Sequence, residues 1–141
     1  MKKFCAIFLA LLLSFCFNIS SFAALPDSPI LSPMYNSITG IVPRISESGS
    51  DIVARVSVST NKTCSVEITM AVQRSTYGTS WANYTSYPKV TLNSGTYRTT
   101  SQTVEDVPTG FYYRTYAIVN VYVNGTLTDS DIVESDPIYV S

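Results

Sequence analysis

Aromatic side chains carry the clearest chemistry in this chain, and they fall into two groups. One short connection holds Tyr77, Trp81, Tyr84 and Tyr87, and a later strand carries Tyr112, Tyr116, Ile118 and Tyr122 at alternate positions. Sugar rings stack their C–H faces on aromatic rings, and protein interfaces are also enriched in Tyr and Trp. The pattern predicts contact with a protein or glycan partner, with candidate contact residues Tyr77, Trp81, Tyr84, Tyr112, Tyr116 and Tyr122.

Each aromatic group also has a structural explanation. Trp81 on its own is expected to fold inward and cap the core, because a large indole is usually mostly buried. The later tyrosines fit ordinary strand propensity and cross-strand pairing as well as a contact surface. Apolar and aromatic residues that line one outer face can mark a partner site, so both explanations stay open.

The residues needed for catalysis are scarce. The chain has no histidine, which excludes serine–histidine and cysteine–histidine pairs and imidazole metal ligands. Glu105 and Asp106 are adjacent, so in an extended chain they point to opposite faces and are expected to decorate a turn. We therefore expect no enzyme, and a carbohydrate-active hydrolase that uses carboxylates is the alternative.

An acidic cluster is the best candidate for a metal site. It comprises Asp129, Asp131, Glu134 and Asp136, and calcium favours several carboxylate oxygens. The spacing matches no EF-hand loop, and charges of this kind also protect a sheet edge from aggregation. A solvated hairpin flank is therefore expected, with no metal or other cofactor.

The N-terminus has the pattern of an export signal. Lys2 and Lys3 precede an apolar run from Phe4 to Phe17, and Ser21 and Ala23 offer small side chains at the two positions that a signal peptidase reads. We expect residues 1–23 to be a cleaved signal peptide and the protein to be secreted. An uncleaved signal or a lipid on Cys16 would instead anchor the chain to a membrane.

Removal of that segment leaves 118 of the 141 residues and Cys64 as the only cysteine, which is expected to be a buried, inert thiol. Without Lys2 and Lys3, 7 basic and 10 acidic residues remain, a net charge of −3. The bases form no stripe, so no nucleic-acid partner is expected. No membrane span is expected after cleavage, because the apolar run of 14 residues lies in the signal and a spanning helix needs about 20.

Strict alternation of apolar and polar residues predicts strands over 52–58, 64–72 and 111–123. In the last of these, Arg114 and Asn120 would be costly to bury unpaired, so the frame of Tyr113, Ala117 and Val119 should face the core. Asn124-Gly125 can adopt the positive φ angles of a tight hairpin, so a strand containing 132–140 should return antiparallel.

Shorter strands are expected over 89–92 and 97–104, and no helical periodicity is present. Residues 24–36 contain three prolines and predict an extended leader, so the folded domain should span 37–141. These features predict an all-β fold, an antiparallel β-sandwich of about seven strands. A small outer-membrane barrel shows the same alternation, but 118 residues leave little room for about eight strands and their loops.

One segment resembles a known family. Val107, Gly110 and Tyr113, in the run Val107-Pro108-Thr109-Gly110-Phe111-Tyr112-Tyr113, resemble the corner before the penultimate strand of fibronectin type III and related immunoglobulin-like domains. The resemblance implies an immunoglobulin-like sandwich with the Tyr113 ring in the core and its hydroxyl bonded to the corner backbone. The stretch 73–81 also resembles small secreted bacterial β-domains. Neither resemblance implies an activity, because sandwiches host many functions.

Overall fold

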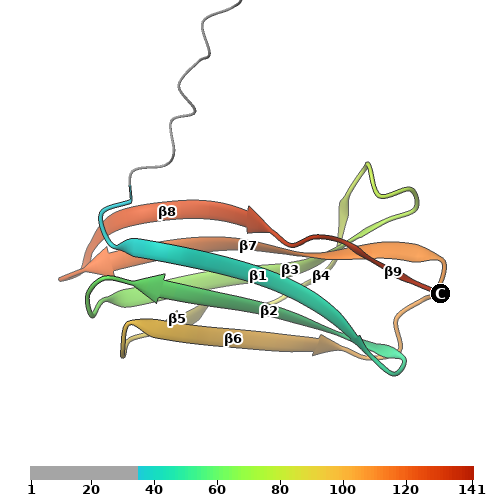
Figure 1. The fold of residues 1–141 in the computed structure, drawn as a ribbon, viewed down its shortest axis with the longest axis horizontal. Helices are drawn as coiled ribbons and strands as arrows, with labels where there is room; N and C mark the ends of the chain where they lie inside the picture. The colour runs from blue at the N-terminus through green and yellow to red at the C-terminus, as the bar shows by residue number, and fades with distance from the viewer. Residues whose placement is uncertain (1–34) are drawn as a thin grey trace, which may run out of the picture. The chain divides into compact units, whose positions relative to one another are not determined.

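Nine antiparallel strands form two sheets in residues 35–141, the part of the chain that the computed structural model describes (Figure 1). One sheet has the order β1-β2-β6 and contains β1 (Ile38–Ser48), β2 (Asp51–Thr60) and β6 (Tyr97–Val104). The other is built on β3 (Ser65–Ser75) and β7 (Phe111–Val123), with β4 (Ala82–Ser86), β5 (Val90–Leu92), β8 (Thr126–Glu134) and β9 (Ile138–Val140) at its edges. The predicted signal peptide and all but the last two residues of the predicted leader lie outside the described residues.

The predicted all-β sandwich is confirmed, with nine strands in the described residues instead of about seven. The difference arises because both edges of the larger sheet are interrupted. β4 and β5 both pair with β3, while β8 and β9 both pair with β7. Each interruption contains a proline, Pro88 or Pro137, which has no N–H to donate to a strand ladder.

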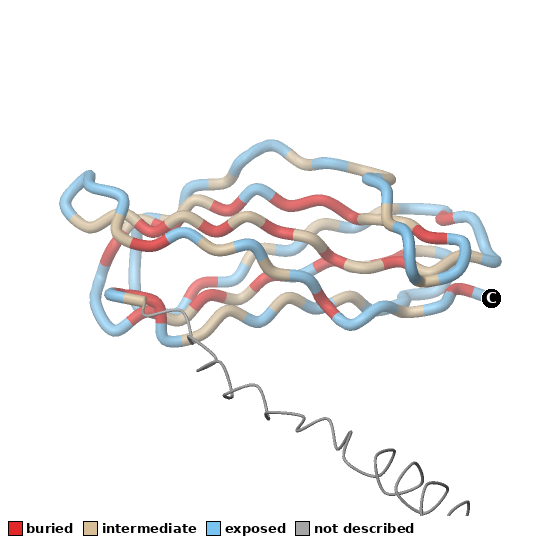
Figure 2. Tube along the Cα trace, turned by 90° about the horizontal axis from the view of Figure 1, so that it is seen from above, coloured by how far each residue is buried: buried red, intermediate tan, exposed pale blue. Residues whose placement is uncertain are grey.

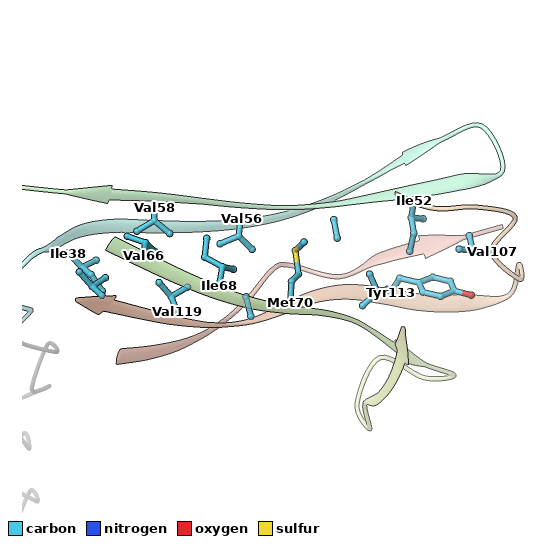
Figure 3. Packing of buried hydrophobic residues seen from close by; sticks show 14 of the residues in the cluster. Ile38, Ile52, Val56, Val58, Val66, Ile68, Met70, Val107, Tyr113 and Val119 are labelled. Atoms are coloured by element: carbon cyan, nitrogen blue, oxygen red, sulfur yellow. The ribbon is translucent and has the colours of Figure 1, made fainter. Parts of the chain in front are cut away.

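The core lies between the two sheets and follows the predicted alternation (Figure 3). The inner residues Ile52 and Val56 of β2 and Val66 and Ile68 of β3 are at most 1% exposed. In β7 the frame of Tyr113, Ala117 and Val119 is fully buried, and Arg114 and Asn120 lie in the outer frame. Figure 2 shows buried positions alternating with more exposed ones along the central strands. The strand frames predicted from the sequence are therefore confirmed.

The turn residues that the sequence singled out adopt special backbone conformations. Asn124 and Gly125 have φ angles of 52° and 79° between β7 and β8. At the corner before β7, Gly110 has a φ of 82° and its N–H donates to the Val140 carbonyl at 2.7 Å. Val107 is 6% exposed and donates its N–H to the Ser50 carbonyl at 3.0 Å. The corner is thus tied to both sheets through its backbone.

The Tyr113 side chain fixes the same corner. Its ring is fully buried, and its hydroxyl donates to the Pro108 carbonyl at 2.7 Å. Figure 3 shows this hydroxyl pointing toward the end of the sandwich near Val107. Burial raises the pKa of Tyr113, so the hydroxyl keeps the proton that it donates.

A buried arginine is the main feature of the core that the sequence pattern did not indicate. Arg98 is 5% exposed and donates to the Cys64 carbonyl at 2.5 Å and to the Thr60 hydroxyl at 3.1 Å. Its Nε has no hydrogen-bond partner in the described structure. Cys64 itself is buried as a free thiol beneath this guanidinium. Arg98 therefore closes the end of the sandwich where the chain crosses from β2 to β3.

The last residues of the predicted leader already contact the sandwich. The Tyr35 hydroxyl donates to Asp131, and the Asn36 N–H donates to the Asp129 carboxylate at 2.6 Å. Ordered contacts with β8 thus begin two residues before Ser37. Among residues 35–141 there is no helix long and apolar enough to cross a membrane.

Candidate functional site

The connection between β3 and β4 forms a folded loop at one end of the larger sheet. Figure 1 shows it projecting beyond the strands near the C-terminus. Gly78 adopts a φ of 74° there, and its N–H donates to the buried Ser75 hydroxyl at 2.9 Å. A Cβ on Gly78 would lie 3.7 Å from the Tyr112 ring, so the loop backbone approaches the outer face of β7. The hydrogen bond from Gly78 to the Ser75 hydroxyl and this close approach give the loop a defined shape.

Arg74 lies at the base of this loop between two aromatic rings. Its guanidinium carbon is 4.4 Å from the centroid of the Phe111 ring and 4.9 Å from that of Tyr84. Register places Arg74 opposite the core residue Tyr113, and the Tyr84 ring meets the Tyr113 ring edge-on at 5.7 Å. Cation–π contacts of this kind contribute about 0.5–2 kcal/mol each and hold the guanidinium plane in place.

Arg74 has no carboxylate partner within the described residues. The ion pairs found between residues 35 and 141 are Lys89–Glu67 and Arg114–Glu134. A guanidinium presents up to five N–H donors in a planar fork that matches a carboxylate or phosphate group. Arg74 is therefore oriented by aromatic rings but not neutralised.

A groove of about 390 Å³ opens over Arg74. Side chains with rings, hydroxyls or an amide line it, namely Ser75, Thr76, Tyr77, Thr79, Ser80, Asn83, Tyr84 and Phe111, together with Ala82 and Arg74 itself. Tyr77 is 83% exposed, so its ring is free to contact a ligand. The groove combines an exposed aromatic ring, a fixed cation and several small hydrogen-bonding groups, which suits a sugar ring that carries an acidic group.

The prediction that Trp81 folds inward to cap the core is wrong. Trp81 is half-buried and lies outside the core cluster. The guanidinium carbon of Arg114, in the outer frame of β7, lies 4.4 Å from the centroid of its ring. Arg114 also donates to Glu134 at 2.5 Å and to Gln73 at 2.8 Å. This network holds the indole on the outer face, where a cation–π contact replaces burial in the core.

The aromatic connection is therefore divided between the two faces of the sheet. Tyr77 and Tyr84 line the groove, while Trp81 lies on the outer face. A register shift between Val72 and Gln73 disrupts the pairing of β3 with β4, and Tyr84 lies within that shift. Tyr84 and Tyr87 pack against the core. The structure thus brings two of the predicted contact residues together with Arg74 and Phe111.

The outer tyrosines of β7 are half-buried, and two of them have internal partners. Tyr112 packs against Tyr139 with ring centroids 4.9 Å apart. Tyr122 donates to Glu67 at 3.1 Å, and Glu67 also accepts from Lys89 at 2.8 Å. The hydrogen bond from Lys89, then that from Tyr122, lowers the pKa of Glu67, and Glu67 in turn raises the pKa of Tyr122.

Tyr116 is the remaining tyrosine of this outer group. Its neighbours in the ladder are Ala71 and Glu134, and no side-chain hydrogen bond involves it within residues 35–141. The exposed Ile132 and Leu127 lie on the neighbouring strand β8. The outer face therefore presents apolar surface beside Tyr116, without the hollow found at the β3–β4 loop.

Each acidic residue of β8 has a separate partner in the structure. Asp129 and Asp131 accept from Asn36 and Tyr35, and Glu134 pairs with Arg114. The hydrogen bond to Asp131 is the main cause that raises the pKa of Tyr35 to about 12. No group of three or more Cys, Asp or Glu side chains in residues 35–141 is placed to hold a metal ion.

Sequence reasoning missed Arg74, Asn83 and Phe111. Phe111 begins a predicted strand and Arg74 lies two residues beyond the end of another, where a charged or aromatic residue carries no periodic pattern. The available indication was the position of Arg74, three residues before Tyr77, in a chain with few cations. Only the pairing of β3 with β4 and β7 brings the three residues to one groove.

No protein-family model matches the chain, and the search of curated proteins finds no match. Among solved structures, the chain is similar to part of a Bacteroides fragilis protein assigned as a β-galactosidase, with 11% identity and a TM-score of 0.44. That match covers 72% of this chain and 16% of the other. A Bacteroides uniformis β-glucuronidase matches with 14% identity and a TM-score of 0.41, covering 67% of this chain and 12% of the enzyme. This chain therefore spans less than a fifth of the length of either protein, whose activities are those of much larger chains.

Proposed function

We propose that this protein is a secreted, non-catalytic binding module that recognises a carboxylate-bearing glycan in the groove at the β3–β4 loop. The observation that carries the proposal is Arg74, which aromatic rings orient at the base of the groove and which no acidic side chain of residues 35–141 neutralises. A carboxylate on the ligand would supply the missing anion. Tyr77 would stack on the sugar ring, because its side chain is almost fully exposed beside the cation.

The non-catalytic part of the proposal rests on how the described carboxylates are used. Asp51 accepts the Asp106 N–H at 3.0 Å, and the Ser50 hydroxyl donates to both side chains, so these acids order a turn. Glu67 and Glu134 are held by Lys89 and Arg114 respectively. None of these carboxylates lines the groove. The arrangement offers no pair of acids for hydrolysis of a glycosidic bond at this site.

We further propose that the sandwich is immunoglobulin-like, of the fibronectin type III kind. The strand order supports this, since β1-β2-β6 faces a sheet built around β3 and β7, and the two interrupted edges reduce nine strands to about seven positions. The hydroxyl of Tyr113 bonds back to the corner backbone, as the resemblance implies. Such a fold commonly presents loops for binding.

A glycan array containing acidic glycans beside their neutral methyl esters tests the proposed function. We expect signal on acidic members only, and about tenfold weaker binding by Arg74→Gln, a loss near 1.4 kcal/mol. Tyr77→Ala should also weaken binding, and Tyr139→Ala, which removes an exposed ring outside the groove, should not. Circular dichroism of each variant checks that the fold persists.

Three results would reject this assignment. If the wild type binds no glycan on the array but captures a protein partner whose contact includes Tyr77, the ligand is a protein. If acidic and neutral members of each pair bind equally, Arg74 does not read a carboxylate. A Tyr139→Ala effect as large as that of Tyr77→Ala would place the binding surface on the outer face instead.

A further inference from the structure

Two arginines lie opposite each other on the outer side of the smaller sheet, whereas the β3–β4 groove belongs to the larger sheet. Arg44 of β1 lies directly opposite Arg55 of β2, and both are exposed. Like charges at directly opposed positions destabilise a sheet. Neither arginine belongs to an ion pair in the described part of the chain. The pair is therefore an unfavourable feature of the free protein that an anion would relieve.

The surroundings of the pair are rich in hydroxyls. A shallow hollow of about 280 Å³ is lined by both arginines with Val42, Ser57, Ser59, Tyr97 and Thr99. Ser57 and Thr99 are hydrogen-bonded across the sheet at 3.0 Å. Tyr97 is 67% exposed, and its contacts with the Ser57 and Thr99 side chains, followed by the Arg44 and Arg55 charges, lower its pKa.

Acidic groups are few near this hollow. Asp136 lines the neighbouring hollow, to which both arginines also contribute, but it lies beyond ion-pair distance of either. Asp51 sits at the hairpin end of β2 and accepts hydrogen bonds from the Asp106 N–H and the Ser50 hydroxyl. The face consequently carries a local positive charge on a chain whose overall charge is negative.

We propose that this face, centred on Arg44, Arg55 and Tyr97, binds an anionic polysaccharide. Two adjacent guanidinium groups can share one sulfate or carboxylate, and the rows of serine and threonine hydroxyls can both donate to and accept from sugar hydroxyls. The exposed Tyr97 ring provides a stacking surface at the edge of the hollow. This site is independent of the groove at Arg74, because it uses the other sheet.

The observations favour a polysaccharide over an acidic peptide. The arginines project from the face of the sheet, in the outer frame, and a peptide that adds to a sheet needs a free strand edge instead. The hollow is open and shallow, with little apolar surface apart from Val42 and Tyr97. An extended, hydroxylated polyanion matches both the charge and the chemistry of the lining.

Titration of the purified protein with dextran sulfate, with neutral dextran as the uncharged control, tests this site. We expect binding of dextran sulfate only, weakened as salt is raised because the contacts are exposed. The double variant Arg44→Gln/Arg55→Gln should bind at least tenfold more weakly. The matched variant Lys62→Gln/Lys89→Gln removes the same charge from exposed positions elsewhere and should change the affinity less than threefold.

Thermal unfolding of the same variants provides a readout that does not depend on ligand. The arginine variant should melt at the same temperature as the wild type or higher, because a like-charge contact is removed. Equal losses of affinity in the two double variants would overturn the proposal, since binding would then follow net charge alone. So would polyglutamate that binds as tightly as dextran sulfate, or an absence of binding at low salt. Arg74→Gln should leave this binding unchanged, which separates the result from any failure of the groove.

Discussion

Removal of the Tyr113 hydroxyl should destabilise the sandwich by a small, defined amount. In Tyr113→Phe the ring stays in the core, and the 2.7 Å hydrogen bond to the Pro108 carbonyl is lost. A neutral hydrogen bond of this kind contributes about 1 kcal/mol. The cost should not be larger, because Pro108 is exposed and water can solvate its carbonyl. Tyr113→Ala additionally removes a fully buried ring and should cost about 3–5 kcal/mol.

Urea unfolding followed by circular dichroism measures both losses of stability. In thermal unfolding, the Phe variant should melt roughly 4 °C lower than the wild type. Tyr116→Phe is the matched control, since its hydroxyl makes no side-chain hydrogen bond within the described residues, and it should stay within about 0.5 kcal/mol. Either of two results would contradict this prediction: Tyr113→Phe is as stable as the wild type, or it loses as much stability as Tyr113→Ala. The first result would mean that the hydroxyl does not fix the corner, and the second that the ring cannot pack without it.

Three further predictions concern a turn, an ionisable contact and the buried thiol. Gly110→Ala should cost about 1–2 kcal/mol in urea unfolding because its φ is 82°, whereas Gly40→Ala, also without a neighbour within 4 Å of the added Cβ, should cost little; equal effects would contradict the strain argument. Asp131 raises the pKa of Tyr35 to about 12, so the stabilising contribution of their hydrogen bond is complete below pH 10, the ordinary pKa of tyrosine, and is lost as the pH rises toward 12. The ultraviolet titration curve of Tyr35→Phe should lack the last tyrosine to ionise, and an unchanged curve would refute the assignment. Cys64 should resist a thiol reagent in the folded protein and react fully in urea, and fast labelling of the native state would show that it is not enclosed.

The strands that the sequence could predict are those with one buried face. In β2, β3 and β7 mostly apolar side chains occupy every second position, and burial of the opposite frame in β7 would enclose Arg114 and Asn120. The energetic cost of that alternative is large, so the pattern determines the frame. The hairpin after β7 was equally predictable from the sequence, because Asn-Gly is one of the few residue pairs that adopt positive φ angles at low cost, as Asn124 and Gly125 do.

The candidate site was less predictable because its residues come from three strands. Arg74, Tyr84 and Phe111 converge only after β3 pairs with both β4 and β7, and a register shift determines the position of Tyr84. Trp81 was expected in the core on the basis of its size alone. The side chain that decides its position is Arg114, whose outward frame was predicted but whose contact with the indole was not.

The opposed arginines illustrate the same limit. Arg44 lies in β1, an edge strand that contains Pro43 and has sparse apolar residues, so no alternation marks it as a strand. Its position opposite Arg55 depends on the register of β1 with β2. Pairings between strands that lack a strong pattern need coordinates, whereas the alternation within a strand does not.

Nuclear magnetic resonance mapping of a bound glycan shows directly whether Arg74 recognises a carboxylate in the β3–β4 groove. The purified, isotope-labelled protein is titrated with the acidic glycan that gives the strongest array signal, and in parallel with its methyl ester. We expect amide shifts concentrated at Arg74, Tyr77, Asn83 and Phe111 with the acidic form, and much smaller shifts with the ester. Shifts that are equal for both forms, or that centre on Tyr116 and Ile132 of the outer face, would contradict it.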